Sequence, residues 1–177
     1  MLYKIIKMIQ AKANLSFQQK MLNPFFFKLF LFLKLPMAFL AGLRLKELSD
    51  SHAVVKMKYN YLNKNPFGSI YFACLSMAGE LASGMLAASI AHKSNPKLSM
   101  LVVEVQINFT KKSVGTILFE CNQGKEILAT IQKSIITGDG QTIDTLTVAS
   151  NEQGDVVAEF LIKWSFKVKG SKTTNTT

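Results

Sequence analysis

The stretch that decides the fold is IYFACLSMAGELASGMLAASIA, residues 70–91, and Glu80 is its only charged residue. Every other side chain in it is apolar, small or uncharged, so a helix here must be wrapped by other elements. A carboxylate in such a helix is costly unless it is hydrogen-bonded, paired, protonated or exposed to a cavity. Burial should raise its pKa toward the range that a general acid or base needs near neutral pH. The alternative is a protonated glutamate that bonds to a nearby backbone or hydroxyl group and takes no part in chemistry.

Segments with alternating apolar and polar residues flank this helix on both sides and predict strands. They cover residues 43–46, 55–61, 101–110, 114–121, 141–150 and 156–168. In the third of them, one face is expected to carry Leu101, Val103, Val105, Ile107 and Phe109. Residues 124–133 fit a helix or a strand, and we expect a short helix. Antiparallel strands of this kind form one sheet that curls around the apolar helix, which predicts an α+β fold.

The N-terminal region is predicted to be helical. Apolar residues at helical spacing among lysines predict a short basic helix over residues 2–13. Ser16 can cap a second helix that runs to about Leu35, and Pro36 should end or kink it. These helices either cover an apolar surface of the body or lie against a membrane, so we keep a weak membrane-surface contact of residues 1–35 as an open alternative.

The charge pattern narrows the choice of partners. The chain has 177 residues and a formal net charge of +10. Its lysines are scattered rather than clustered, which argues against nucleic acid and leaves either surface solubility or an affinity for anionic ligands, such as coenzyme A phosphates, an acidic carrier protein or a lipid surface. No convincing signal peptide is found, so we expect a cytoplasmic protein.

Two segments are long enough to be weighed as membrane spans, residues 24–43 and 70–91. Lys28 and Lys34 disfavour the first because charges are expensive at the bilayer centre. The strands that closely flank the second disfavour it as a span. Cysteine and histidine are too few and too far apart to form a metal pattern or a disulfide scaffold, so we expect no metal.

The segment NPFGSIYFACLSMAGE, residues 65–80, links a polar loop to the helix, and Asn65, Gly68 and Glu80 are its chemical landmarks. It resembles acyl-CoA thioesterases of the phenylacetate-pathway type, in which an acidic helix residue also follows an Asn by 15 positions and a Gly stands three positions after that Asn. The chain also resembles a hotdog family catalogued only as a domain of unknown function, whose members open with a similar apolar segment and a proline. This second resemblance extends over nearly the whole chain.

The resemblance implies a hotdog fold, in which a curled antiparallel sheet wraps one long central helix, here with extra N-terminal helices. It divides the chain into an N-terminal helical extension at 1–36, a hotdog domain at 37–169 and a disordered tail at 170–177. It also implies an acyl thioester as substrate, either acyl-CoA or an acyl carrier protein, with no cofactor besides the coenzyme A of the substrate.

Roles for single residues follow from the same resemblance. Glu80 would be the general base on water or the nucleophile, Asn65 would orient the water or the thioester, and the backbone N–H of Phe72 would stabilise the oxyanion. Loop residues and hydroxyls on the Glu80 side of the helix would contact the substrate. These are Gly68, Ser69, Tyr71, Ser76 and Ser83.

The resemblance further implies a homodimer or tetramer, in which Glu80 of one subunit faces Asn65 and Phe72 of the other. Lys111 or Lys112 would then meet coenzyme A phosphates at the mouth of the site. One departure matters: those thioesterases have His-Gly or Gly-Gly where this chain has Tyr71-Phe72 or Phe72-Ala73. A glycine lets the backbone approach the thioester closely. The departure favours a second hypothesis, a non-catalytic acyl-binding or lipid-binding protein. A dehydratase is disfavoured because the loop from residue 60 to residue 71 has no histidine.

Overall fold

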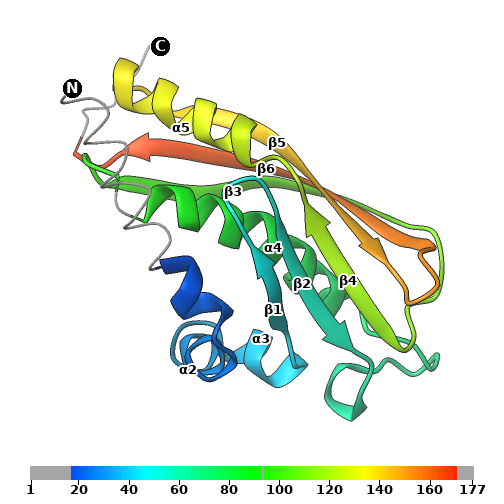
Figure 1. Ribbon diagram of the computed structural model, residues 1–177. Helices are drawn as coiled ribbons and strands as arrows, with labels where there is room; N and C mark the ends of the chain where they lie inside the picture. Colours follow the sequence, from blue (N-terminus) through cyan, green and yellow to red (C-terminus); the bar gives the residue numbers. More distant parts are fainter. Residues whose placement is uncertain (1–16, 93, 171–177) are drawn as a thin grey trace.

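The computed structural model describes residues 17–92 and 94–170 (Figure 1). One antiparallel sheet, in the order β1-β2-β4-β5-β6-β3, packs on the long helix α4 (Phe72–Ala91), as the sequence predicts. The strands are β1 (Arg44–Leu48), β2 (Ala53–Lys58), β3 (Leu98–Phe109), β4 (Thr116–Cys121), β5 (Gln141–Ser150) and β6 (Val156–Val168). The ambiguous segment after β4 is a helix, α5 (Gly124–Thr137), which packs against α4, β5 and β6.

Two predicted segments fall largely outside this description. The basic helix expected over residues 2–13 lies outside the described residues, and so does the tail expected at 170–177, apart from Gly170.

The single helix expected from Ser16 to Leu35 is wrong, because the chain breaks at Asn23. Residues 17–22 are helical, and α2 (Pro24–Lys34) then begins anew. The Asn23 side chain accepts hydrogen bonds from the N–H groups of Phe25 and Phe26 at 3.0 and 3.4 Å, and the proline that follows it suits the first position of a helix. Pro36 ends α2 as predicted and starts the short helix α3 (Pro36–Ala41).

The strand β3 differs from the expected alternation. Its pairing with β6 shifts register between Val102 and Glu104, where a β-bulge inserts Val103. Past a bulge the two faces exchange, so Val102 shares the inner face with Val105, while Leu101 turns outward and is 64% exposed. The prediction that Leu101 and Val103 line the face of Phe109 is therefore wrong.

The close fit of α4 on the sheet depends on a small residue and a polar anchor. A Cβ on Gly79 would lie 2.5 Å from the buried ring of Phe160, so only glycine lets the helix approach β6 this closely. About one helical turn further along α4, the indole N–H of Trp164 donates to the hydroxyl of Ser83 at 3.0 Å. These two contacts fix how the helix is rotated on the sheet, and therefore which of its residues stay uncovered.

Candidate functional site

The carboxylate of Glu80 is half-buried and has no hydrogen-bond or ion-pair partner among the residues that the structure describes. Burial raises its pKa above the ordinary value, as the sequence predicts, because desolvation disfavours the charged form. Its Oε1 atom lies over Gly84, where an added Cβ would approach it to 3.0 Å. The alternative of a glutamate that bonds to a nearby backbone or hydroxyl group therefore finds no such partner in residues 17–92 and 94–170.

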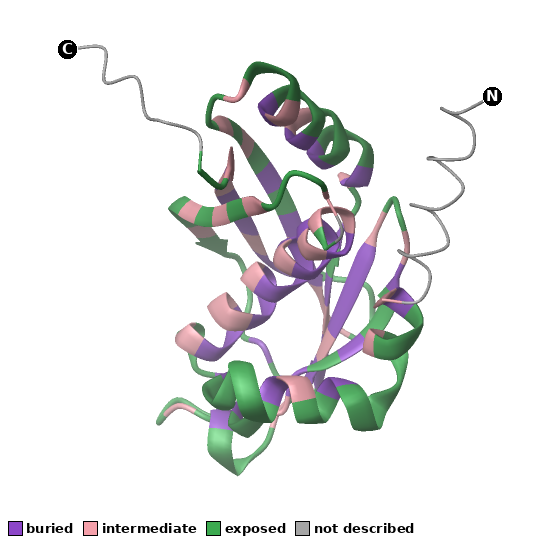
Figure 2. Cartoon of the chain, turned by 90° about the vertical axis from the view of Figure 1, so that its left-hand side faces the viewer, coloured by how far each residue is buried: buried purple, intermediate pink, exposed green. Residues whose placement is uncertain are grey.

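Glu80 belongs to a lengthwise stripe of α4 that the sheet leaves uncovered, which we call the open face of α4. All of its residues are half-buried: Ala73, Ser76, Met77, Glu80, Gly84, Ala88 and Ala91. Figure 2 shows this face in pink beside the buried, purple side of the helix. The expectation of a wholly buried helix is therefore wrong, because this stripe, most of whose residues are small, is left uncovered. The edge strand β3 also leaves Val105 and Phe109 more than 40% exposed.

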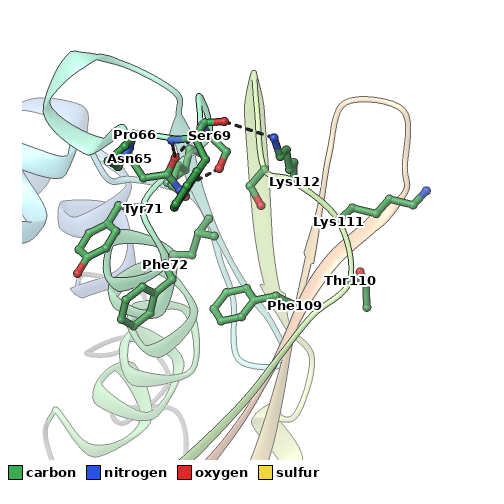
Figure 3. A pocket seen from close by; sticks show the side chains of 13 residues that line it. Asn65, Pro66, Ser69, Tyr71, Phe72, Phe109, Thr110, Lys111 and Lys112 are labelled. Carbon is green, nitrogen blue, oxygen red and sulfur yellow. Dashed lines mark hydrogen bonds between the residues drawn. The ribbon is translucent and has the colours of Figure 1, made fainter.

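A second cluster of predicted site residues surrounds a cavity of about 550 Å³ at the N-terminus of α4 (Figure 3). The loop before the helix forms one wall, with Asn65, Ser69, Tyr71 and Phe72. The end of β3 and the turn after it, residues 109–113, form the other wall. Figure 3 shows the rings of Phe72 and Phe109 beside each other, and they are nearly perpendicular with centroids 6.5 Å apart.

Asn65 gives the loop its shape. Its Oδ1 accepts from the N–H groups of Phe67 and Ser69 at 2.9 and 3.2 Å, and its Nδ2 donates to the Ser69 hydroxyl at 3.0 Å. Gly68, with φ of 74°, takes a backbone conformation that side chains rarely adopt. The Asn-x-x-Gly-Ser pattern thus has a structural role in this protomer, and the amide of Asn65 is largely committed to the loop.

The helix N-terminus offers unused donors. Tyr71 is the N-cap residue and its side chain makes no capping bond. The backbone N–H groups of Phe72 and Ala73 have no acceptor among the described residues, as expected for the first turn of a helix, and the dipole adds positive potential there. The Phe72 side chain is 55% exposed and lines the cavity, so the ring stands beside the donor that the resemblance assigned to the oxyanion.

The predicted site residues do not all meet in one protomer. Glu80 stands eight residues along the helix from Phe72, about 12 Å at the ordinary rise, and neither Glu80 nor Ser76 lines the cavity. Ser83 is fully buried, and its hydroxyl contacts Trp164 and the Glu80 carbonyl, so the protein holds it away from any substrate. The predicted placement of Ser83 on the accessible side of the helix is wrong.

Ser113 is a cavity residue that the sequence analysis does not single out. It lines the cavity, is 3% exposed, and its hydroxyl has no hydrogen-bond partner among the described residues. Buried hydroxyls without partners are rare in folded proteins. Only the pairing of its backbone carbonyl with the N–H of Ile70, at 2.9 Å, brings it beside the loop, and no local pattern signals that contact.

The two lysines of the same turn have different interaction partners. Lys111 points away from the cavity and its ammonium pairs with Asp155 at 3.0 Å (Figure 3). Lys112 reaches back over the loop and donates to the carbonyl of Phe67 at 3.4 Å. Of the two candidates for a phosphate contact, Lys112 is the one held at the cavity mouth.

The described residues contain no metal-binding cluster and one helix that is long enough to span a membrane. No three His, Cys, Asp or Glu side chains in residues 17–92 and 94–170 come together as a metal site would require. Within the same residues, α4 is the one helix long and apolar enough to cross a membrane, and most of it is buried inside the protein.

Comparison with known families decides where the chain belongs. The family described as Domain of unknown function (DUF4442) matches residues 25–166. The chain belongs to this family. No curated protein matches the chain.

Several solved structures, among them proteins called probable or putative thioesterases, share the fold of this chain, which is the hotdog fold that the resemblance implied. A protein of unknown function from Pseudomonas aeruginosa, called a probable thioesterase, superposes with a TM-score of 0.70 at 21% identity over 81% of this chain and 95% of its own. A protein of unknown function from Chlorobaculum tepidum gives 0.69 at 14% identity over 82% and 97%. A thioesterase enzyme from Staphylococcus aureus gives 0.55 at 16% identity over 72% and 94%.

Proposed function

We propose that this protein hydrolyses acyl thioesters of coenzyme A or of an acyl carrier protein, with Glu80 as the general base on water or as the nucleophile. The observation that carries the proposal is the state of the Glu80 carboxylate. It is desolvated enough for its pKa to be raised, yet it has no partner in the described protein and lies on an uncovered face. A structural glutamate would be expected to find a donor, whereas a catalytic one keeps its lone pairs for a proton.

The proposed site is shared between two protomers. The open face of α4 would be covered by a second copy, which would bring its own loop of Asn65 and its own helix N-terminus toward Glu80. Water deprotonated by Glu80 would attack the thioester carbonyl, and the free N–H of Phe72 would stabilise the developing oxyanion. Collapse of the tetrahedral intermediate would release the thiolate, which takes up the proton held by Glu80, and the carboxylic acid.

Comparisons lend this proposal indirect support. Two structures of the Staphylococcus aureus protein carry substitutions of a Gln and of a Glu to Ala at positions 15 residues apart. The same interval separates Asn65 and Glu80 in this chain. A protein named a thioesterase enzyme thus has a side-chain amide and a carboxylate at the same interval as Asn65 and Glu80, and both were replaced by alanine.

A panel of acyl-CoA substrates of increasing chain length tests the proposal directly. The wild type should release coenzyme A from at least one of them, and Glu80→Gln should lower kcat by roughly 100-fold or more, the usual contribution of a general base. The matched control is Glu120→Gln, an exposed glutamate of β4, which should leave kcat unchanged. No turnover by the wild type, or equal turnover by Glu80→Gln, would exclude this mechanism.

A second candidate is a non-catalytic acyl-binding or lipid-binding protein, and one observation favours it. The exposed ring of Phe72 occupies the cavity edge where related thioesterases were expected to have a glycine, and it would crowd a thioester at the N–H donors. Native mass spectrometry of freshly purified protein would distinguish the two. A co-purified acyl compound without any hydrolysis favours binding, whereas an empty cavity with turnover favours catalysis.

A further inference from the structure

The helices α2 and α3 carry an apolar surface that the body of the protein leaves uncovered. Only Phe27 and Leu31 anchor α2 as fully buried residues. Large apolar side chains on its other sides, and on α3, are exposed to solvent, including Phe25 (71% exposed), Phe26 (50%), Phe32 (58%), Leu33 (63%), Met37 (64%) and Leu40 (49%). Figure 2 shows both helices mostly green in the lower part of the molecule. We call this surface the α2–α3 patch.

The patch is continuous and has a groove. The ring of Phe32 on α2 packs edge-on against Phe39 on α3 at 5.5 Å between centroids, which joins the two helices into one surface. A groove of about 240 Å³ lies along its α2 side, with Leu29 and Leu33 among its apolar lining residues and Lys20 and Lys34 among its charged ones. A surface helix of a water-soluble domain ordinarily turns polar residues outward, so an outward apolar surface of this size indicates an interaction site.

Charge identifies the partner. Residues 17–43 contain Lys20, Lys28 and Lys34 and no acidic residue, and the first Asp or Glu in the chain is Glu47. An apolar surface that carries lysines and no acidic residue complements a bilayer with anionic headgroups. The aromatic rings can enter the boundary of the acyl chains while the lysine ammonium groups contact the headgroup phosphates.

Length excludes a crossing. The helix α2 has 11 residues, and at the ordinary rise it extends about 16 Å, half of the ~30 Å hydrocarbon core. We therefore infer that the α2–α3 patch seats the protein on the surface of an anionic bilayer, with α2 lying in the interface plane. Near this surface, the Asn63 side chain donates to the carbonyl of Ala41 at 3.0 Å and so joins α3 to the loop that carries Phe67, which is 77% exposed.

Vesicle co-sedimentation of the full chain tests the inference. Phosphatidylcholine vesicles with phosphatidylserine should bind the protein, pure phosphatidylcholine should bind it less, and added salt should weaken the binding. Phe25→Ser with Leu33→Ser should reduce the affinity at least tenfold, since two exposed apolar side chains lose their place in the bilayer. Lys28→Gln with Lys34→Gln should reduce it roughly 25-fold, at about fivefold per lysine.

Matched controls come from α5, which also exposes apolar and cationic side chains. Leu128→Ser with Ile136→Ser removes residues that are 43% and 83% exposed, and Lys125→Gln with Lys133→Gln removes two exposed lysines. Both control pairs should leave vesicle binding unchanged. Binding that falls equally in the controls, or no binding to anionic vesicles at all, would overturn the inference. So would a patch variant that changes the sedimentation coefficient in the absence of lipid, because the patch would then cover a second copy of the chain.

Discussion

At the scale of single residues, Glu80 is held in a state that costs stability at neutral pH. Burial raises the pKa of its carboxyl above the model-compound value of 4.5, and no donor among the described residues offsets the desolvation of the charged form. A group with a raised carboxyl pKa binds more protons in the folded state than in the unfolded chain. Its contribution is therefore neutral below about pH 4.5 and increasingly unfavourable as the pH rises through the folded-state pKa.

Removing this charge should stabilise the protein. Glu80→Gln keeps the shape of the side chain, so the midpoint of urea unfolding should rise at pH 7, and the difference from the wild type should vanish at pH 4. The exposed Glu120→Gln should show no such pH-dependent gain. A Glu80→Gln variant that is less stable than the wild type at pH 7 would mean that the carboxylate has a partner, for example across a subunit interface.

The unpartnered hydroxyl of Ser113 leads to a second prediction at this scale. Ser113→Ala breaks no hydrogen bond of the described protein, so the free energy of unfolding should stay the same or rise by up to about 1 kcal/mol. If a ligand occupies the cavity, the same variant should raise KM for the best acyl-CoA substrate by severalfold. Unchanged KM together with unchanged stability would limit Ser113 to filling space.

At the scale of elements, the two glycines of α4 have different tasks. Gly79 faces the sheet, where a methyl group would collide with the ring of Phe160, which cannot move because it is fully buried. Gly84 faces outward, where a methyl group would meet the end of the Glu80 side chain at 3.0 Å and Trp164 at 3.3 Å. The first glycine sets the distance between helix and sheet, and the second leaves room for the carboxylate.

The pair Gly79→Ala and Gly84→Ala separates these tasks. Gly79→Ala should cost about 1–3 kcal/mol of stability, because the clash exceeds the gain in helix propensity. Gly84→Ala should be close to neutral in stability, since a gain of up to about 1 kcal/mol in propensity offsets a small repacking cost. It should nevertheless lower kcat for thioester hydrolysis by moving Glu80. Equal stability of the two variants in thermal unfolding would contradict this assignment.

At the scale of the whole molecule, the separation of Glu80 from the cavity makes a prediction about assembly. If the proposed site joins Glu80 of one protomer to the loop of its partner, then Glu80→Ala and Asn65→Ala are defects in opposite halves of each site. Each homodimer should be inactive, whereas a mixed dimer contains one intact site and one site with both defects. Random exchange of equal amounts should restore roughly a quarter of the wild-type rate. No recovery after subunit exchange, verified by labelled protomers, would place both residues in the same protomer's site.

Local pattern was sufficient for much of this fold. The apolar run of α4 and the strict alternation of β6 are repeated signals over many residues, and both predicted elements are present. The wrong predictions concern places where a single residue determines the local structure. Asn23 breaks a helix because its side chain caps the next one, and Val103 forms a bulge because β3 must stay in register with β6.

The sequence by itself determined that a helix with one carboxylate lies inside a curled sheet, because hydrophobic periodicity is local and dictates which elements must bury each other. It also determined that Asn65 and Gly68 form a tight polar loop before that helix, because their side-chain and backbone preferences act within a few residues. Only the tertiary structure decided which side of α4 stays open and leaves Glu80 without a partner. It also decided that Ser113 reaches the cavity and that α2 turns Phe25, Phe26 and Phe32 outward. These features depend on the packing of residues distant in the chain, such as Phe160 on Gly79 and Trp164 on Ser83, and no local pattern encodes such contacts.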